Sequence, residues 1–309
     1  MSLIAESTRA EAHARLYKRS HVGRWIGGTI VLALVISIIV TMAGARISWP
    51  DVISFMTYDV MLEGAVNTVI LALTAQVSAV VIGVIVAVMK ISHNPVASWV
   101  ATGYIWIFRG VPVLVQILLW YNLALVTDRI TISIPFTGIV LFDESTNAVM
   151  TAFVAALLGL ALNESAYMAE IIRGGIKGID PGQAEAAGAL GMSPMRTLHR
   201  VVLPQAMRII IPPTGNNFIN MLKTTSLAST VTYLELLKAA NNIASRNLAI
   251  MESLFTTSIW YMIIVSLASI AQYYIERRFD ASTSREQRTG LWTKIRQQLK
   301  TPPTVRSPK

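Results

Sequence analysis

Residues 65–89 read AVNTVILALTAQVSAVVIGVIVAVM, a run of 25 residues without a charged side chain. A helix of about 20 mostly apolar residues is long enough to cross the hydrocarbon core of a bilayer. The whole chain has the same character, with 53% apolar and 14% charged residues, whereas a soluble domain carries about a quarter charged residues. The sequence therefore predicts an all-α membrane protein.

Five further segments are predicted to span the membrane, so that we expect six transmembrane helices. Residues 25–45 and 254–274 are also long apolar runs, whereas 103–126 and 148–172 carry a few polar side chains. The segment 213–234 is only weakly hydrophobic. It is expected to begin at Pro212-Pro213, because proline suits a helix start and because the topology requires a crossing there.

The basic residues predict the orientation of these spans. Of the 26 Lys and Arg residues, 21 lie on one side of the six-span topology and 4 on the other, with Lys223 inside a span. Lys and Arg collect on the cytoplasmic side of a bilayer, so both termini are predicted to be cytoplasmic. The same rule accounts for the formal net charge of +9 without a nucleic-acid partner.

The N-terminal region allows two pairs of alternatives. Ala43-Gly44-Ala45 resembles a signal-peptidase site, but the apolar run before it is longer than that of a usual signal peptide, which favours a retained span. Residues 5–20 alternate apolar and basic side chains. They either form a helix on the lipids of the inner leaflet or a frayed basic tail.

The loop between the fourth and fifth predicted spans contains DPGQAEAAGALGMSPMRTLHRVVLPQA, residues 180–206. Asp180 is a favourable N-cap, Pro181 suits the first helical position, and Gln183 can complete a capping box. Gly191 is placed to end this helix in a left-handed C-cap. The small side chains on the helix surface permit close approach by a partner.

A second helix is expected to begin at Ser193-Pro194 and to end at Pro204, because proline suits a helix start and breaks a helix interior. The loop should therefore consist of two short helices joined by a glycine hinge. In the predicted orientation this hairpin lies on the cytoplasmic side.

The spacing within this loop resembles the EAA signature of ABC-importer permeases. Its elements are Glu185-Ala186-Ala187, Gly191 and Leu203-Pro204, with Val201 where the family usually has isoleucine. The resemblance implies that residues 177–206 form a coupling element that docks on an ATP-hydrolysing subunit. Glu185, Ala186 and Ala187 would make the docking contacts. The alternative is an ordinary amphipathic cytoplasmic hairpin.

Three further stretches resemble the polar amino acid permeases, a group for histidine, glutamine, arginine and opines. They are RGVPVLVQ at 109–116, AYMAEIIRGG at 166–175, and NN at 216–217 followed by KTTSLAS at 223–229. The resemblance implies a type I importer fold with five core spans in residues 61–279, to which residues 25–60 add one N-terminal span and an external loop. Residues 1–24 and 280–309 would be basic cytoplasmic ends of a protein in the bacterial inner membrane.

The same resemblance implies the partners. A second permease chain, identical or paralogous, would form a dimer with this one, two ATPase subunits would bind the coupling loops, and an extracytoplasmic solute-binding protein would deliver a polar amino acid. The chain has no GxxxxGK(S/T) phosphate-binding loop, so ATP hydrolysis belongs to another polypeptide and this chain is expected to be neither an enzyme nor a cofactor protein. An alternative is an ion-coupled secondary transporter of amino acids or small amines, for which inverted repeats would be expected.

Polar side chains at membrane depth are candidates for the substrate pathway, because ionisable groups in a span usually face a cavity or a partner. They lie in three predicted spans: Gln116; Asn163, Glu164 and Tyr167; Asn216, Asn220 and Lys223. Glu164 and Lys223 lie at similar predicted depths, where a zwitterionic amino acid would meet both an anion and a cation. Alternatively, the two charges neutralise each other and the amides bond between helices.

No metal site is expected. The chain contains no cysteine, which excludes disulfides and thiolate ligands, and its four histidines have no metal-ligand spacing.

Overall fold

The computed structural model describes residues 22–43 and 47–280, which fall into two units divided after Ser48. The first unit contains one helix, α2 (Val22–Ala43), which covers most of the predicted span 25–45. The basic segments 1–21 and 281–309 lie outside the described residues, as does part of the Ala43-Gly44-Ala45 motif. The N-terminal membrane-surface helix and the C-terminal tail therefore stay predictions.

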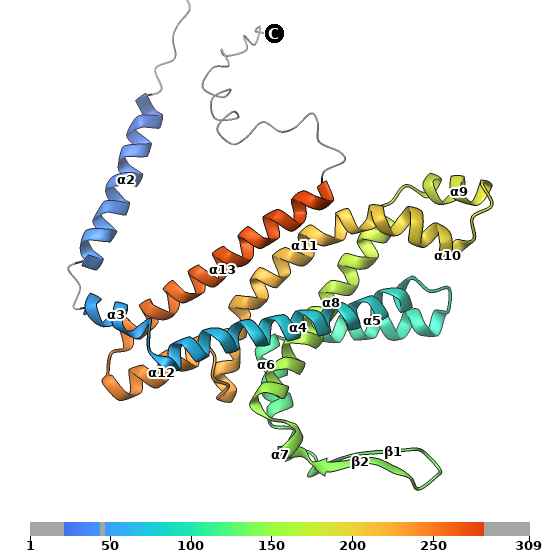
Figure 1. The fold of residues 1–309 in the computed structure, drawn as a ribbon, viewed down its shortest axis with the longest axis horizontal. Helices are drawn as coiled ribbons and strands as arrows, with labels where there is room; N and C mark the ends of the chain where they lie inside the picture. The colour runs from blue at the N-terminus through green and yellow to red at the C-terminus, as the bar shows by residue number, and fades with distance from the viewer. Residues whose placement is uncertain (1–21, 44–46, 281–309) are drawn as a thin grey trace, which may run out of the picture. The chain divides into compact units, whose positions relative to one another are not determined.

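The second unit is a helical bundle (Figure 1). It begins with a short helix, α3 (Trp49–Phe55). Three of its helices are long and apolar enough to cross a membrane: α4 (Asp59–Ile91), α8 (Ala152–Lys177) and α13 (Ile250–Asp280). They contain or overlap almost all of the predicted spans 65–89, 148–172 and 254–274. Among the described residues a bent pair of helices makes a fourth candidate, so a total of six crossings stays a prediction.

The predicted span 103–126 is wrong as a single continuous helix. It is broken into α5 (Pro95–Gly110) and α6 (Val113–Tyr121), which are bent by 98°. Pro112 stands at the break and is the N-cap of α6. Proline lacks a backbone N–H and its ring clashes with the preceding turn. A short 3-10 turn, η1 (Leu123–Leu125), follows α6.

The predicted start of the span 213–234 is also wrong. The helix α11 (Leu203–Thr224) runs through Pro212-Pro213 and gives way to a 3-10 segment, η3 (Thr225–Val231). Prolines are tolerated inside a membrane helix when neighbouring side chains satisfy the freed backbone groups. Here Nε2 of Gln272 on α13 donates to the carbonyl of Pro212 at 3.2 Å.

The expectation of an all-α protein is wrong at one place, because residues 129–145 form a β-hairpin. The strands β1 (Arg129–Ser133) and β2 (Val140–Ser145) are antiparallel and lead into a single turn of helix, α7 (Thr146–Val149). β1 alternates polar and β-branched apolar residues with a period of two, which is typical of strands. That alternation covers only a few residues in the loop between two predicted spans, and no strand was predicted there.

Small residues allow α8 to pack closely in the centre of the bundle. A Cβ added to Gly83 of α4 would lie 2.7 Å from the Cβ of Met168 on α8. A Cβ added to Gly159 of α8 would lie 2.9 Å from the backbone nitrogen of Ile117 on α6. Glycine is needed at both positions because two backbones approach each other there.

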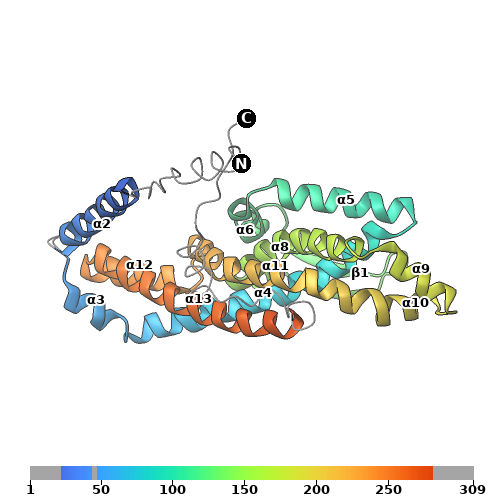
Figure 2. The ribbon, with the colours of Figure 1, turned by 90° about the horizontal axis from the view of Figure 1, so that it is seen from above.

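Two pairs of short helices lie at opposite ends of the bundle. At one end lie α3 and α12 (Leu236–Asn247). The buried carboxylate of Glu235 caps α12 by accepting from the N–H groups of Leu237 and Lys238, at 2.9 and 2.7 Å, and from the hydroxyl of Tyr261 at 2.8 Å. At the other end lie α9 and α10 (Figures 1 and 2).

Candidate functional site

The loop after α8 has the predicted helix–glycine–helix form. The first helix, α9 (Pro181–Ala189), begins with Pro181, and the Asp180 side chain accepts from the N–H of Gly182 at 2.9 Å. Gly191 has φ +76 and follows the end of α9. Its N–H donates to the carbonyl of Gly188 at 2.9 Å, and that of Met192 donates to Ala187 at 3.1 Å. The left-handed C-cap is confirmed.

The predicted end of the second helix at Pro204 is wrong. α10 (Pro194–Thr197) continues through a π-helical turn, η2 (Leu198–Val202), directly into α11. Pro204 is the second residue of α11 and directly follows the π-helical turn, so the helix continues through it. The wider π turn absorbs the change of hydrogen-bonding pattern. The second arm of the coupling loop is therefore an extension of the long helix α11 and not a separate short helix.

Gln183 has a different role from the predicted capping box. Its side-chain oxygen accepts from Nε2 of Gln205 at 3.4 Å, and the same nitrogen donates to the carbonyl of Val201 at 2.9 Å. The contact with Gln183 joins α9 to the beginning of α11, whereas the contact with Val201 lies within the second arm of the hairpin.

The six predicted coupling residues do not all face outward. Glu185, Ala186, Gly191 and Pro204 are exposed and Leu203 is half-buried. Ala187 is only 5% exposed, so its predicted docking contact is revised: its small side chain is turned into the hairpin and allows α9 to pack there. A hollow of about 580 Å³ lies under α9 and is lined mainly by apolar residues at the end of α8 and on both arms, including Ile176, Ile179, Ala184 and Leu198.

Two apolar residues of this loop were missed by the sequence analysis. Leu190 is 84% exposed and Met195 is also exposed. Large apolar side chains on either side of a glycine hinge, in a loop predicted to be cytoplasmic, were the signal that could have identified them. Together with Glu185 and Ala186 they belong to the exposed surface of the hairpin.

Two candidate pathway residues hold the bend between α5 and α6. The buried Gln116 donates through Nε2 to the carbonyls of Phe108 and Val111, at 3.0 and 2.9 Å. Nδ2 of Asn163 on α8 donates to the same carbonyl of Phe108 at 2.6 Å. A helix end leaves backbone carbonyls without hydrogen-bond donors. The two amide side chains donate to these carbonyls at a depth where water is scarce.

Glu164 and Lys223 do not contact each other in the chain. An oxygen of Glu164 accepts from Nδ2 of Asn217 on α11 at 2.6 Å, whereas Lys223 is exposed. Neither side chain takes part in the ion pairs Arg129–Asp143 and Arg173–Glu170 of the described residues. The predicted mutual neutralisation is therefore absent from the described residues.

Three of the seven candidate pathway residues meet around one small hollow. It has a volume of about 70 Å³ and lies between α6, α8 and α11, where it is lined by Val113, Leu160, Asn163, Glu164, Asn220, Met221 and Thr224. Asn216 and Lys223 lie on the exposed face of α11. Tyr167 is exposed on α8, with the Arg109 guanidinium carbon 4.8 Å from the centre of its ring.

Comparison with known proteins assigns the family. The model of the binding-protein-dependent transport system inner membrane component matches residues 79–281. The arginine transport system permease protein ArgU of Corynebacterium glutamicum is 40% identical over 267 residues, covering 86% of this chain and 83% of the relative. The probable amino-acid permease protein YxeN of Bacillus subtilis is 36% identical over 232 residues, covering 75% and 95%.

A solved structure supports the same assignment. The crystal structure of an amino acid ABC transporter with histidines superposes with a TM-score of 0.64 at 32% identity, and the match covers 76% of this chain and 100% of the solved chain. The chain therefore belongs to the family of binding-protein-dependent transport system inner membrane components, the multi-pass permease subunits of ABC transporters.

Proposed function

We propose that this chain is the permease subunit of an ATP-binding-cassette importer for polar amino acids. The observation that carries the proposal is the α9–Gly191–α10 hairpin, which exposes Glu185 and Leu190 on α9 and its C-cap and is joined through its second arm to α11. Permeases of this family are not enzymes, and a separate subunit hydrolyses ATP. No feature of the described residues favours the alternative of an ion-coupled transporter.

The family implies an ATPase and a substrate-binding protein as partners. We assign the exposed surface of the hairpin, with Glu185, Ala186 and Leu190, to the ATPase. Gly191 sets its angle, while Leu203 and Pro204 connect it to α11. A second permease chain would complete the pathway beside the exposed face of α11.

The proposed orientation, with the hairpin in the cytoplasm and α12 outside, rests on the distribution of basic residues. The parent chain has no cysteine, so a single introduced thiol can be followed without background. A membrane-impermeant maleimide added to intact cells should label Asn241→Cys on α12 and leave Ser193→Cys unlabelled until the cells are opened. Labelling of Ser193→Cys but not of Asn241→Cys in intact cells would show that the topology is the reverse of the proposed one.

The substrate pathway is proposed to pass the hollow formed by Asn163, Glu164 and Asn220. Glu164 offers an anion for the amino group of the substrate, and Lys223 on the exposed face of α11 offers a cation for its carboxylate. Asn216 and Tyr167 flank these groups, and Gln116 keeps the bend in place. The relatives' names support an amino acid as the cargo, and both charges match a zwitterion.

The test is ATP hydrolysis by the permease–ATPase complex in lipid nanodiscs, with the solute-binding protein and a panel of arginine, histidine, glutamine, glutamate and cystine. At least one of these should raise hydrolysis above the basal rate, and Lys223→Met should lower that stimulation more than about ten-fold by removing the cation proposed to bind the substrate carboxylate. Basal hydrolysis should be retained. If no amino acid stimulates the parent complex, the assigned cargo is wrong, and if Lys223→Met responds normally, Lys223 lies outside the pathway.

A further inference from the structure

The β1–β2 hairpin leaves the helical body between α6 and α8, the two helices that carry Gln116, Asn163 and Glu164. It stands at the beginning of α8, whereas the coupling hairpin α9–α10 stands at the end of α8 (Figure 1). α8 has 26 residues, so the two hairpins are separated along it by about 39 Å, a distance sufficient to cross a bilayer. In the proposed orientation the β-hairpin is extracytoplasmic.

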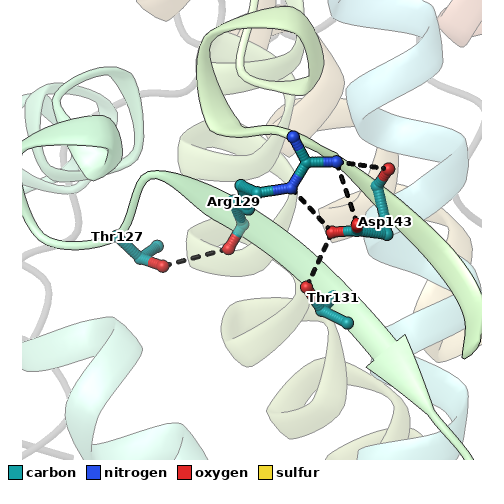
Figure 3. A network of polar contacts seen from close by, with 4 residues as sticks. All are labelled: Thr127, Arg129, Thr131 and Asp143. Atoms are coloured by element: carbon teal, nitrogen blue, oxygen red, sulfur yellow. Dashed lines mark hydrogen bonds and ion pairs between the residues drawn. The ribbon is translucent and has the colours of Figure 1, made fainter.

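A polar network gives the hairpin a defined shape at its base (Figure 3). Nε and Nη2 of Arg129 donate to the two carboxylate oxygens of Asp143, each at 2.9 Å, and the Thr131 hydroxyl donates to the same carboxylate at 2.9 Å. The Arg129 guanidinium holds the pKa of Asp143 below its usual range. The Thr146 hydroxyl and N–H donate to the carbonyls of Thr127 and Asp128, at 2.6 and 2.9 Å, and fasten the base to α7.

The strand register separates a polar face from an apolar face. Directly paired residues share a face and neighbours alternate. The pair Thr131–Asp143 therefore lies on the face of Arg129, whereas Ile132–Phe142 lies on the opposite one. The irregularity after Ile132 places Val140, paired with Ser133, on the polar face. The apolar side chains on this face are Ile130, Ile132, Ile134, Ile139 and Phe142, and all except Ile130 are exposed. Glu144, the partner of Ile130, lies on the same face near the base of the hairpin.

The tip of the hairpin presents an aromatic side chain in a strained conformation. Phe136 has φ +66 and its side chain is fully exposed. A left-handed conformation costs a residue with a β-carbon about 1 kcal/mol or more. Glycine or asparagine would adopt this turn more easily. A strained residue that gains nothing from its own fold points to a contact with another molecule.

The charges of the hairpin indicate what covers its apolar face. Residues 128–145 contain Asp128, Asp143 and Glu144 against Arg129 alone, a net charge of −2, and neither Trp nor Tyr. A ribbon lying on lipid would be rich in basic and interfacial aromatic residues. Contact between two copies of the hairpin would bring like charges together. Both arguments favour a different protein with an apolar centre and a basic rim.

We propose that the apolar face and tip of the β1–β2 hairpin are the surface on which the extracytoplasmic solute-binding protein docks. The proposal rests on the proposed function of the chain. A two-stranded hairpin is marginally stable in isolation, and a docked protein would bury its exposed isoleucines. Because the base is fastened to α7 and is continuous with α6 and α8, docking would act on the helices that surround the polar hollow.

A matched pair of substitutions tests the face. Ile132 is 54% exposed and Val140 is 56% exposed, but they lie on opposite faces. Ile132→Ser should raise the concentration of loaded binding protein that gives half-maximal stimulation of ATP hydrolysis by about ten-fold, as expected for a central apolar contact. Val140→Ser should change that concentration less than about two-fold, as a residue outside the contact would. Phe136→Asn keeps a residue that tolerates the left-handed turn, removes the ring and should behave like Ile132→Ser.

The nanodisc assay described for the substrate panel provides the measurement, with the amino acid that stimulates most. Basal hydrolysis and the yield of assembled complex should be unchanged in all three variants. Equal half-maximal concentrations in Ile132→Ser, Val140→Ser and the parent would overturn the docking surface alone. A parent complex that does not respond to any loaded binding protein would overturn the proposed function, and the docking surface with it.

A crosslinking experiment identifies the occupant directly. Phe136→Cys carrying a benzophenone maleimide should give, on illumination with loaded binding protein, an adduct of permease and binding protein. Val140→Cys should give much less. An adduct of two permease chains, or adducts with lipid acyl chains without any protein adduct, would show that the hairpin faces a second copy or the membrane and would overturn the proposal.

Discussion

Gly191→Val should abolish the stimulation of ATP hydrolysis by loaded binding protein and leave the permease in the membrane at normal abundance. Gly191 has φ +76, and no heavy atom lies within 4 Å of the position that a Cβ would take. The substitution is therefore expected to act through the backbone conformation and not through a steric clash. A left-handed backbone costs an ordinary residue about 1–2 kcal/mol, and a β-branched side chain is among the least tolerated. The turn that directs Leu190 outward would be lost.

Gly191→Asn is the matched control, because asparagine adopts the left-handed conformation at lower cost. It should retain most of the stimulation. Glu185→Lys should keep the turn but weaken co-purification of the ATPase by reversing a charge at the interface. The measurement is hydrolysis by the purified complex with and without loaded binding protein. A normal response of Gly191→Val would show that this loop is not the coupling element.

Gly159→Ala should have the largest effect on stability. The added Cβ would lie 2.5 Å from Cγ1 of Ile117 and 2.9 and 3.0 Å from its backbone N and Cα. A side chain can rotate away, but the backbone of α6 cannot, so α6 would have to move off α8. Overpacking of this kind costs about 1–3 kcal/mol or more. We expect a lower midpoint of thermal unfolding and a reduced yield in detergent.

Gly174→Ala on the same helix is the control. No heavy atom lies within 4 Å of the Cβ that it would add. Alanine is favoured over glycine inside a helix by roughly 0.5–1 kcal/mol, so this variant should be as stable as the parent or slightly more stable. The measurement is the fraction of each variant that remains monodisperse in size-exclusion chromatography after heating. Comparing the two variants separates the effect of close packing from that of helix propensity. Equal losses in the two variants would contradict the packing explanation.

The features that the sequence determined by itself have local causes. Bilayer thickness sets the length of the apolar runs in α4, α8 and α13, and each run carries that information without reference to its neighbours. The form of the coupling loop follows from Asp180, Pro181 and Gly191, because the N-cap, the proline ring and the missing β-carbon each restrict the backbone where they stand. These predictions needed no knowledge of tertiary contacts.

The bend after α5 and the course of α11 were not predictable in this way. Pro112 breaks a helix whereas Pro212-Pro213 does not. Proline has the same backbone chemistry at both places. The two places differ in the side chains around the proline. At the break, Gln116 and Asn163 donate to the free carbonyl at the end of α5. In α11, Gln272 donates to the carbonyl of Pro212 from another helix.

The sequence predicted which polar residues could line the pathway, but only the packing of the helices determines which of them come together. Depth along a helix placed Glu164 and Lys223 at one level, but the rotation of α11 against α8 brings Asn217 to Glu164 and leaves Lys223 exposed. The β-hairpin likewise depends on pairing between strands that are separate in the sequence. Such contacts are determined by the relative placement of elements, because hydrogen bonds and close packing reach only a few ångströms and a single segment does not specify what comes within that reach.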